Sequence, residues 1–273
     1  MTLLKKALKK YREVLDFLFD RDPDVGGKTV FITGKLRSGK TTLMQRLAIR
    51  FLEDTDDIIV WRGLRTAQFT RFPDELVCIH IPRKTPTTFK DIKTQELIVP
   101  DEHWEISRYT DKYNLLNNLK KNRDKINVVY MQNNKWHQFL DYLPKRDDLN
   151  WFSIFFDEVE DIFPSFATQE YWDMIKDLSN SIKYYGQTLI NFFMATQQHT
   201  GVHWLIKDKI MFWILLPGAK VPRHLRLKQP AIDNLKLGEA YICGSEFQKF
   251  KFSSVKNPKR KHIRVDLPEL QEE

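Results

Sequence analysis

The sequence predicts an α/β fold, in which a largely parallel central sheet is flanked by helices and followed by an antiparallel hairpin. Short apolar runs that are typical of buried strands alternate with longer segments of helical periodicity, as in chains of βα units. A glycine-containing loop joins the first such strand to the first long helix. The chain has 273 residues, which is enough for one large domain with a substantial core.

The expected elements follow one another in a regular order from residue 28 onward. Strands are expected at 28–34, 56–64, 74–82, 125–131, 151–157, 188–197 and 209–218. Helices are expected at 40–54, 136–143, 168–186 and 202–208. The hairpin is expected from 235–244 and 246–254. Each strand is a mostly apolar run, and the helices place apolar residues at spacings of three and four.

The chain divides by pattern into three parts, at 1–24, 25–252 and 253–273. The first part is predicted to be an amphipathic helix that docks on the sheet or on another subunit. Its apolar stripe consists of Leu4, Leu8, Tyr11, Leu15 and Leu18. The second part is the main domain, and its polar stretch at about 83–124 is expected to be an insertion of short elements at the surface. The third part is a charged tail that is expected to be partly disordered.

The charge favours a polyanionic partner such as nucleic acid, although it could also serve solubility alone. The net charge is +8 and the isoelectric point is near 9.3. Cys78 and Cys243 lie in strand-like runs and are expected to be buried, reduced thiols without a metal. The N-terminus has no cleavable signal pattern, and no apolar run is long enough to span a membrane.

The loop after the first strand matches the pattern G-x-x-x-x-G-K-[ST] at every fixed position. Its residues are Gly34, Lys35, Leu36, Arg37, Ser38, Gly39, Lys40 and Thr41, followed by Thr42. Backbone N–H groups of such a loop surround a phosphate, and the following helix directs its positive dipole end towards the anion. The pattern predicts that these residues bind a nucleotide, with Lys40 on the β- and γ-phosphates and Thr41 on Mg²⁺.

Two later strands end in residues that predict hydrolysis. Asp157 ends an apolar strand, where an acid would hold the magnesium shell. Glu158 follows it and is suited to accept a proton from an attacking water, although it could simply cap the strand. Gln197 ends the strand at 188–197 and could contact the γ-phosphate or the water, or could be a turn residue. With Lys40, these two side chains form the candidate catalytic set.

These residues, in this order, resemble the FtsK–HerA branch of P-loop ATPases, which have RecA/FtsK-like sheets. The matching features are the loop at 34–41, Asp157 with Glu158, Gln197, and a closing hairpin that contains Gly238, Glu239 and Ala240. The resemblance covers about 28–80 and 125–252. The compact size is similar to that of archaeal viral or plasmid members.

The resemblance implies that 25–252 is a P-loop ATPase domain that binds ATP with Mg²⁺ and moves double-stranded DNA, as translocases and packaging motors do. It implies a homo-oligomeric, hexameric ring in which an arginine of a neighbouring subunit completes each site. Arg223, Arg226 and Arg62 are the candidates for this arginine, and each could instead be an ordinary surface residue. The expected location is the cytoplasm, or the host-cell cytoplasm if the protein is viral, without direct membrane insertion.

Two basic stretches are candidates for sequence-independent contact with the DNA backbone. The first contains Lys120, Lys121, Arg123, Lys125, Lys135 and Trp136. The second lies in the tail and contains Lys256, Lys259, Arg260, Lys261 and Arg264. A solvated helix face and a solubilising chain end are the alternative interpretations.

Two other functions are open at this point. A P-loop kinase would transfer the phosphoryl group to a small acceptor, but the Asp157-Glu158 pair and the closing hairpin argue against it. A Zot-like assembly or secretion ATPase would share the core but act at a membrane. The sequence contains neither the membrane segments nor the winged-helix module that FtsK-like pumps usually have.

Overall fold

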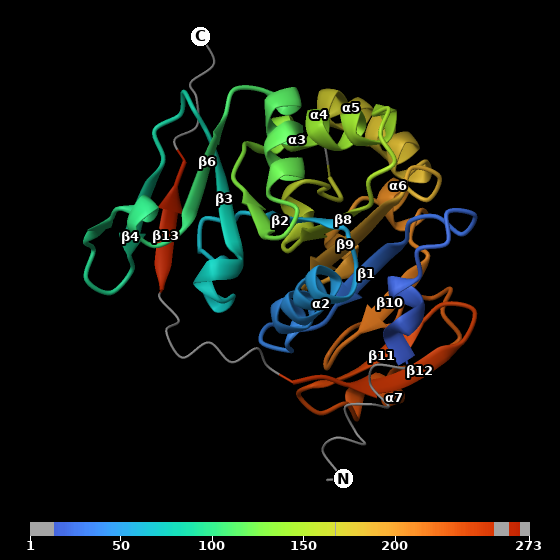
Figure 1. Ribbon diagram of the computed structural model, residues 1–273. Helices are drawn as coiled ribbons and strands as arrows, with labels where there is room; N and C mark the ends of the chain where they lie inside the picture. The colour runs from blue at the N-terminus through green and yellow to red at the C-terminus, as the bar shows by residue number, and fades with distance from the viewer. Residues whose placement is uncertain (1–13, 167, 254–261, 268–273) are drawn as a thin grey trace.

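The computed structural model describes residues 14–166, 168–253 and 262–267, and its centre is one ten-stranded sheet (Figure 1). The strand order is β12-β11-β10-β1-β9-β8-β2-β7-β3-β6. Eight strands are parallel: β1 Thr29–Thr33, β2 Ile58–Arg62, β3 Val77–Pro82, β6 Glu105–Tyr109, β7 Ile126–Val129, β8 Phe152–Phe156, β9 Ile190–Thr196 and β10 Phe212–Leu215. The predicted hairpin, β11 Glu239–Cys243 and β12 Phe247–Lys251, adds two antiparallel strands at one edge. The expected fold class is confirmed.

Helices cover both faces of this sheet. One face carries α2 Lys40–Asp54 and the short helix η1 Asp16–Phe19. The other face carries α3 Lys112–Lys121, α4 Asn133–Tyr142, α5 Gln169–Lys183, α6 Trp204–Lys207 and α7 Gln229–Asp233. Single turns of 3-10 helix connect the elements at Phe69–Arg71, Asp74–Leu76, Pro100–Glu102, Leu143–Lys145, Val159–Asp161 and His199–Gly201. Within the described residues, no helix is both long and apolar enough to cross a membrane.

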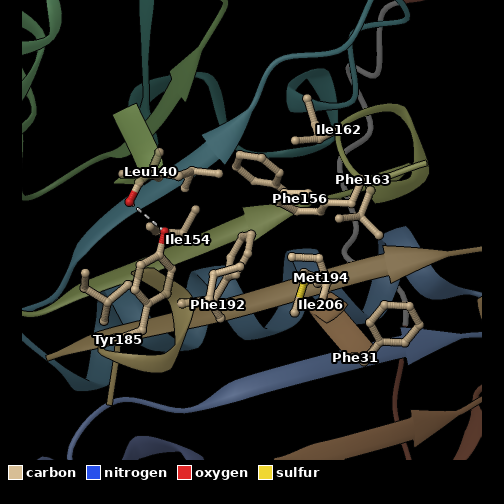
Figure 2. Close-up of a cluster of buried hydrophobic side chains, with 14 of the residues drawn as sticks. Phe31, Leu140, Ile154, Phe156, Ile162, Phe163, Tyr185, Phe192, Met194 and Ile206 are labelled. Carbon is tan, nitrogen blue, oxygen red and sulfur yellow. Dashed lines mark hydrogen bonds between the residues drawn. The ribbon is translucent and has the colours of Figure 1, made fainter. Parts of the chain in front are cut away.

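Strand alternation divides the apolar side chains between two cores. Phe192 and Met194 of β9 pack on the side of α4 and α5, whereas Phe193 between them packs on the side of α2. Figure 2 shows the first core, where the Tyr185 hydroxyl donates a hydrogen bond of 2.9 Å to the Leu140 carbonyl oxygen. Because both faces of the central strands are buried, these strands are continuous apolar runs without polar alternation.

The stretch at 83–124 differs from the expected surface insertion. Its second half, β6 and α3, extends the main sheet, because β6 pairs in parallel with β3. Its first half contributes β4 Thr88–Asp91 and β5 Leu97–Ile98 to a separate antiparallel sheet. The third strand of that sheet is β13 Ile263–Asp266, from the segment that was expected to be a tail (Figure 1).

Most of the predicted N-terminal helix lies outside the described residues, including Leu4, Leu8 and Tyr11. Of its stripe, the structure describes Leu15 and Leu18, and both are buried in the core on the α2 side of the sheet. This part of the chain therefore contacts the sheet, which is one of the two expected alternatives. Both cysteines are buried free thiols, as expected.

Candidate nucleotide site

A cleft of about 550 Å³ opens where the central parallel strands end at their carboxyl termini. This edge is where open α/β sheets bind their ligands, because the loops that follow neighbouring strands converge there. Residues 36–42 of the predicted loop line the cleft together with Asp157, Glu158 and Gln197. The structure thus brings together residues from the ends of β1, β8 and β9, and the end of β1 lies more than a hundred positions before the other two in the chain.

The loop between β1 and α2 is tightly wound, and its glycines are required by geometry. Gly39 has φ +100°, a left-handed conformation that favours glycine, and a Cβ atom there would lie 3.1 Å from the ring of Phe252. A Cβ atom on Gly34 would lie 2.6 Å from the Ser38 hydroxyl oxygen. The loop therefore curls back on itself immediately before the first turn of α2.

Two polar side chains of the loop fit an anion. The Lys40 ammonium group donates hydrogen bonds to the carbonyl oxygens of Gly34 at 2.8 Å and Lys35 at 3.0 Å, so it lies over the curl of the loop. Burial lowers its pKa, and the charge of Asp157 opposes this shift. The buried Ser38 hydroxyl has no partner within the described residues. A bound phosphate would supply acceptors for both groups.

The metal-holding residues predicted from the sequence are in direct contact. The Thr41 hydroxyl donates a hydrogen bond of 2.5 Å to Asp157 Oδ2. Strand β9 lies between β1 and β8, so this contact forms because α2 crosses the sheet face towards β8. A hydroxyl and a carboxylate are oxygen ligands of the kind that Mg²⁺ prefers, and the donor set therefore fits that ion.

Glu158 and Gln197 face the same cleft from adjacent strand ends. Glu158 has an exposed side chain and a left-handed backbone, with φ 52° and ψ 50°. Partial desolvation, and then repulsion from Asp157, Asp161 and Glu160, raises the pKa of its carboxyl group. A raised pKa suits a carboxylate that must accept a proton. Gln197 is exposed directly after β9 and lines the cleft beside the loop.

Arg62 is buried and bonded within its own chain, whereas a residue that completes a neighbour's site must be exposed. It is only 5% exposed and does not line the cleft. Its guanidinium group donates hydrogen bonds to the carbonyl oxygens of Asp157 at 3.0 Å and Glu158 at 2.9 Å, and it pairs with Asp161 at 3.3 Å. These bonds within its own chain fix the turn that presents Glu158. Arg223 and Arg226 are exposed after β10 and also lie outside the cleft lining.

Only part of the first basic stretch is available for the expected contact with DNA. Trp136 is fully buried in the core, so it is not available to stack on a base. Lys120 pairs with Asp148 at 2.7 Å, and Lys125 pairs with Glu105 at 2.8 Å. Lys121, Arg123 and Lys135 are exposed, which agrees with the alternative interpretation of a solvated face. In the second stretch, Lys256, Lys259, Arg260 and Lys261 lie outside the described residues.

Several residues of the cleft were not predicted. Gln68 and Arg71 come from the connection after β2, and Leu237, Gly238 and Phe252 come from the closing hairpin. The glycine of the hairpin was noted only as part of a resemblance, and its place in the cleft has no local sequence signal. Gln68 lies in a polar connection without a recognisable pattern, so only the fold brings it to the site.

The comparisons with known proteins agree with this geometry. No model of a known protein family matches the sequence, and no curated protein is significantly similar to it. Among solved structures, the chain is similar to the genome packaging NTPase B204 from Sulfolobus turreted icosahedral virus 2 in complex with ATP-gammaS, with a TM-score of 0.52 and 14% identity over 85% of this chain and 99% of that one. The B204 complex with AMPPCP gives a TM-score of 0.50, with the same identity and coverage. The chain therefore has the fold of a P-loop NTPase.

Proposed function

We propose that this chain is an ATPase motor that hydrolyses ATP in the cleft and uses the energy to move double-stranded DNA. The observation that supports this most directly is the 2.5 Å contact between Thr41 and Asp157 beneath the loop. It joins a phosphate-holding loop and a metal-holding strand end, while Glu158 stands beside them in the same cleft. The solved relatives, which include a genome packaging NTPase, make a packaging-type motor the preferred form of this activity.

The roles of the site residues follow from their positions. The loop amides and Lys40 would bind the β- and γ-phosphates, and Thr41 and Asp157 would hold Mg²⁺. When bound, that ion neutralises charge that develops on the phosphates. Glu158 would take the proton of the attacking water, since its raised pKa brings its basicity closer to neutral pH. Gln197 would contact the γ-phosphate or the water from the next strand.

We further propose that the chain acts as a homo-oligomeric ring, with six subunits as the expected number. Arg223 and Arg226 are the preferred arginines for completing a neighbour's site, because they are exposed and follow β10. Arg62 is not preferred, because its guanidinium group is buried and bonded to the turn of its own chain.

A cluster of cations beside the cleft is the surface that we assign to the DNA backbone. Lys35 and Lys220 line a small hollow of about 140 Å³ together with Gln197. Lys207 lies nearby, and its ammonium group donates to the His199 carbonyl oxygen at 3.2 Å. Burial lowers the pKa of His199, and the charges of Lys207 and Lys220 lower it further, which indicates a positive potential here. We call these three lysines the basic cluster; such a surface binds phosphates without reading sequence.

The test is the rate of ATP hydrolysis with and without double-stranded DNA, measured beside the assembly mass with ATP. Wild-type protein is expected to be stimulated by DNA and to assemble. Glu158→Gln is expected to bind ATP and assemble but to lose at least roughly a hundredfold in rate, because a general base contributes about that much. Glu53→Gln, on the exposed side of α2, is the matched control and should hydrolyse normally.

Three results would contradict the proposal. Normal hydrolysis by Glu158→Gln would show that Glu158 is not the general base. A monomeric wild-type protein whose hydrolysis rate does not change with DNA would contradict the proposed motor activity. Negligible phosphate release without an added acceptor, even with DNA and Mg²⁺, would favour a kinase of a small acceptor instead.

A further inference from the structure

We propose that Gln68 is a positioning residue for the carboxylate that holds the metal, an inference that rests on the proposed function. Its side-chain amide donates a hydrogen bond of 2.9 Å from Nε2 to Asp157 Oδ2. The same oxygen accepts the Thr41 hydroxyl, so a single carboxylate oxygen receives both donors. The other oxygen, Oδ1, accepts the backbone N–H of Glu158 at 3.0 Å. The carboxylate is thus oriented from three elements of the fold.

The orientation of the Gln68 amide has a consequence for the cleft. Only its NH₂ end can donate to an ionised carboxylate, so contact with Asp157 fixes which end faces that way. The opposite end, Oε1, is then a buried acceptor, and it has no partner within the described residues. Gln68 itself lines the cleft. An unused acceptor beside the metal-holding residues matches the hydrogen-bond donors of a metal-bound water.

The position of Gln68 is maintained from two directions. Gln45, a buried residue of α2, donates from Nε2 to the Gln68 carbonyl oxygen at 3.1 Å. On the other side, the backbone N–H of Ala67 donates to Ile263 of β13 at 2.9 Å. Gln68 is therefore fixed between the helix that follows the nucleotide loop and the separate three-stranded sheet. Supporting hydrogen bonds of this kind hold a metal ligand in its productive orientation.

The experiment measures how Mg²⁺ strengthens the binding of a fluorescent, non-hydrolysable ATP analogue. Gln68→Met keeps the length and packing of the side chain but removes both hydrogen-bonding ends. The Mg²⁺ concentration that gives half of the increase in affinity for the analogue is expected to rise roughly 10- to 100-fold. This is the usual effect of losing a residue that supports a metal ligand. The affinity of Gln68→Met for the analogue in EDTA should equal that of wild type, because the loop contacts are unchanged. Gln68→Asn, whose amide is one methylene shorter, is the second variant and has the same expectation.

The control is Gln248→Met on the exposed face of β12, which should leave the Mg²⁺ requirement unchanged. An unchanged requirement in both Gln68 variants would overturn the inference. An equal loss of affinity with and without Mg²⁺ would also overturn it, because that result indicates a role in the fold alone. Failure of the proposed function would appear differently: wild type would bind the analogue with Mg²⁺ but would not hydrolyse ATP.

Discussion

At the scale of single residues, the cleft depends on a turn that the backbone does not favour by itself. Glu158 adopts a left-handed conformation, which costs a non-glycine residue about 1–2 kcal/mol. Arg62 compensates for this, because Nη1 of its guanidinium group donates to the carbonyl oxygens of both Asp157 and Glu158. The other terminal nitrogen, Nη2, pairs with Asp161 at 3.3 Å, so the rigid fork of arginine holds the carbonyl oxygens and this carboxylate at once. Arg62, a candidate for contact with a neighbouring subunit, thus stabilises a turn within its own chain.

The pH dependence of hydrolysis is a prediction at this scale. If Glu158 is the base, the rate falls as pH drops through its pKa, because the protonated form cannot accept a proton. Repulsion from Asp161 contributes to the raised pKa, so Asp161→Asn should lower the pKa of Glu158. The acid limb of the kcat profile should then move to lower pH. Asp173→Asn on the exposed face of α5 should not move it, and an upward or absent shift in Asp161→Asn would contradict the assigned base.

At the scale of elements, the strands are also joined at the edge opposite the cleft. Asp57 precedes β2, and its side chain is fully buried. Its Oδ2 accepts the Ser153 hydroxyl of β8 at 2.5 Å and the Asn191 amide of β9 at 3.3 Å. Arg21 completes the network with bonds of 2.7 Å and 2.9 Å to the two carboxylate oxygens. Arg21 therefore links the segment before β1 to β2, β8 and β9 through the Asp57 carboxylate.

The buried ion pair between Arg21 and Asp57 gives a prediction about stability. Arg21→Ala leaves the Asp57 carboxylate buried without its charged partner, which is expected to lower the free energy of unfolding by about 3 kcal/mol. Lys145→Ala removes an exposed ion pair with Asp141 and should cost less than about 0.5 kcal/mol. Urea unfolding at neutral pH measures both values. Equal effects of the two variants would show that the buried network is no stronger than a surface pair.

The elements also show why one part of the fold was predictable and another was not. Strands such as β1, β8 and β9 are short apolar runs beside clear helices, so local sequence determines them and their ends identify the cleft. Strand β4 instead pairs with β13, about 170 positions later in the chain, and β6 is a partly exposed edge strand. Pairing of distant, polar segments leaves little local signal. Gln68 likewise contacts Asp157, a residue distant in the chain, so no local pattern assigns it to the site.

At the scale of the whole molecule, the cleft and the basic cluster lie on the same edge of the sheet. Lys35 belongs to the nucleotide loop itself, and Lys220 lies close enough to share a hollow with Gln197. A polyanion held by these lysines would therefore be next to the residue proposed to respond to hydrolysis. If the chain moves DNA as proposed, this proximity would couple the nucleotide state to DNA affinity, because the proposed contacts to both lie in the loops after β1, β9 and β10.

The prediction that follows is a salt-dependent loss of DNA binding in Lys220→Glu. Each phosphate contact that is lost should reduce the slope of log affinity against log salt by about one, and the reversed charge should weaken binding for all DNA sequences alike. Lys145→Glu changes the net charge equally but lies in the 3-10 turn after α4, in a hollow that contains none of the basic cluster, so its DNA affinity should stay close to wild type. Fluorescence anisotropy with a double-stranded oligonucleotide at several salt concentrations measures both quantities. If the two variants weaken binding to the same extent, only the overall charge matters, and the basic cluster is not the surface that contacts DNA.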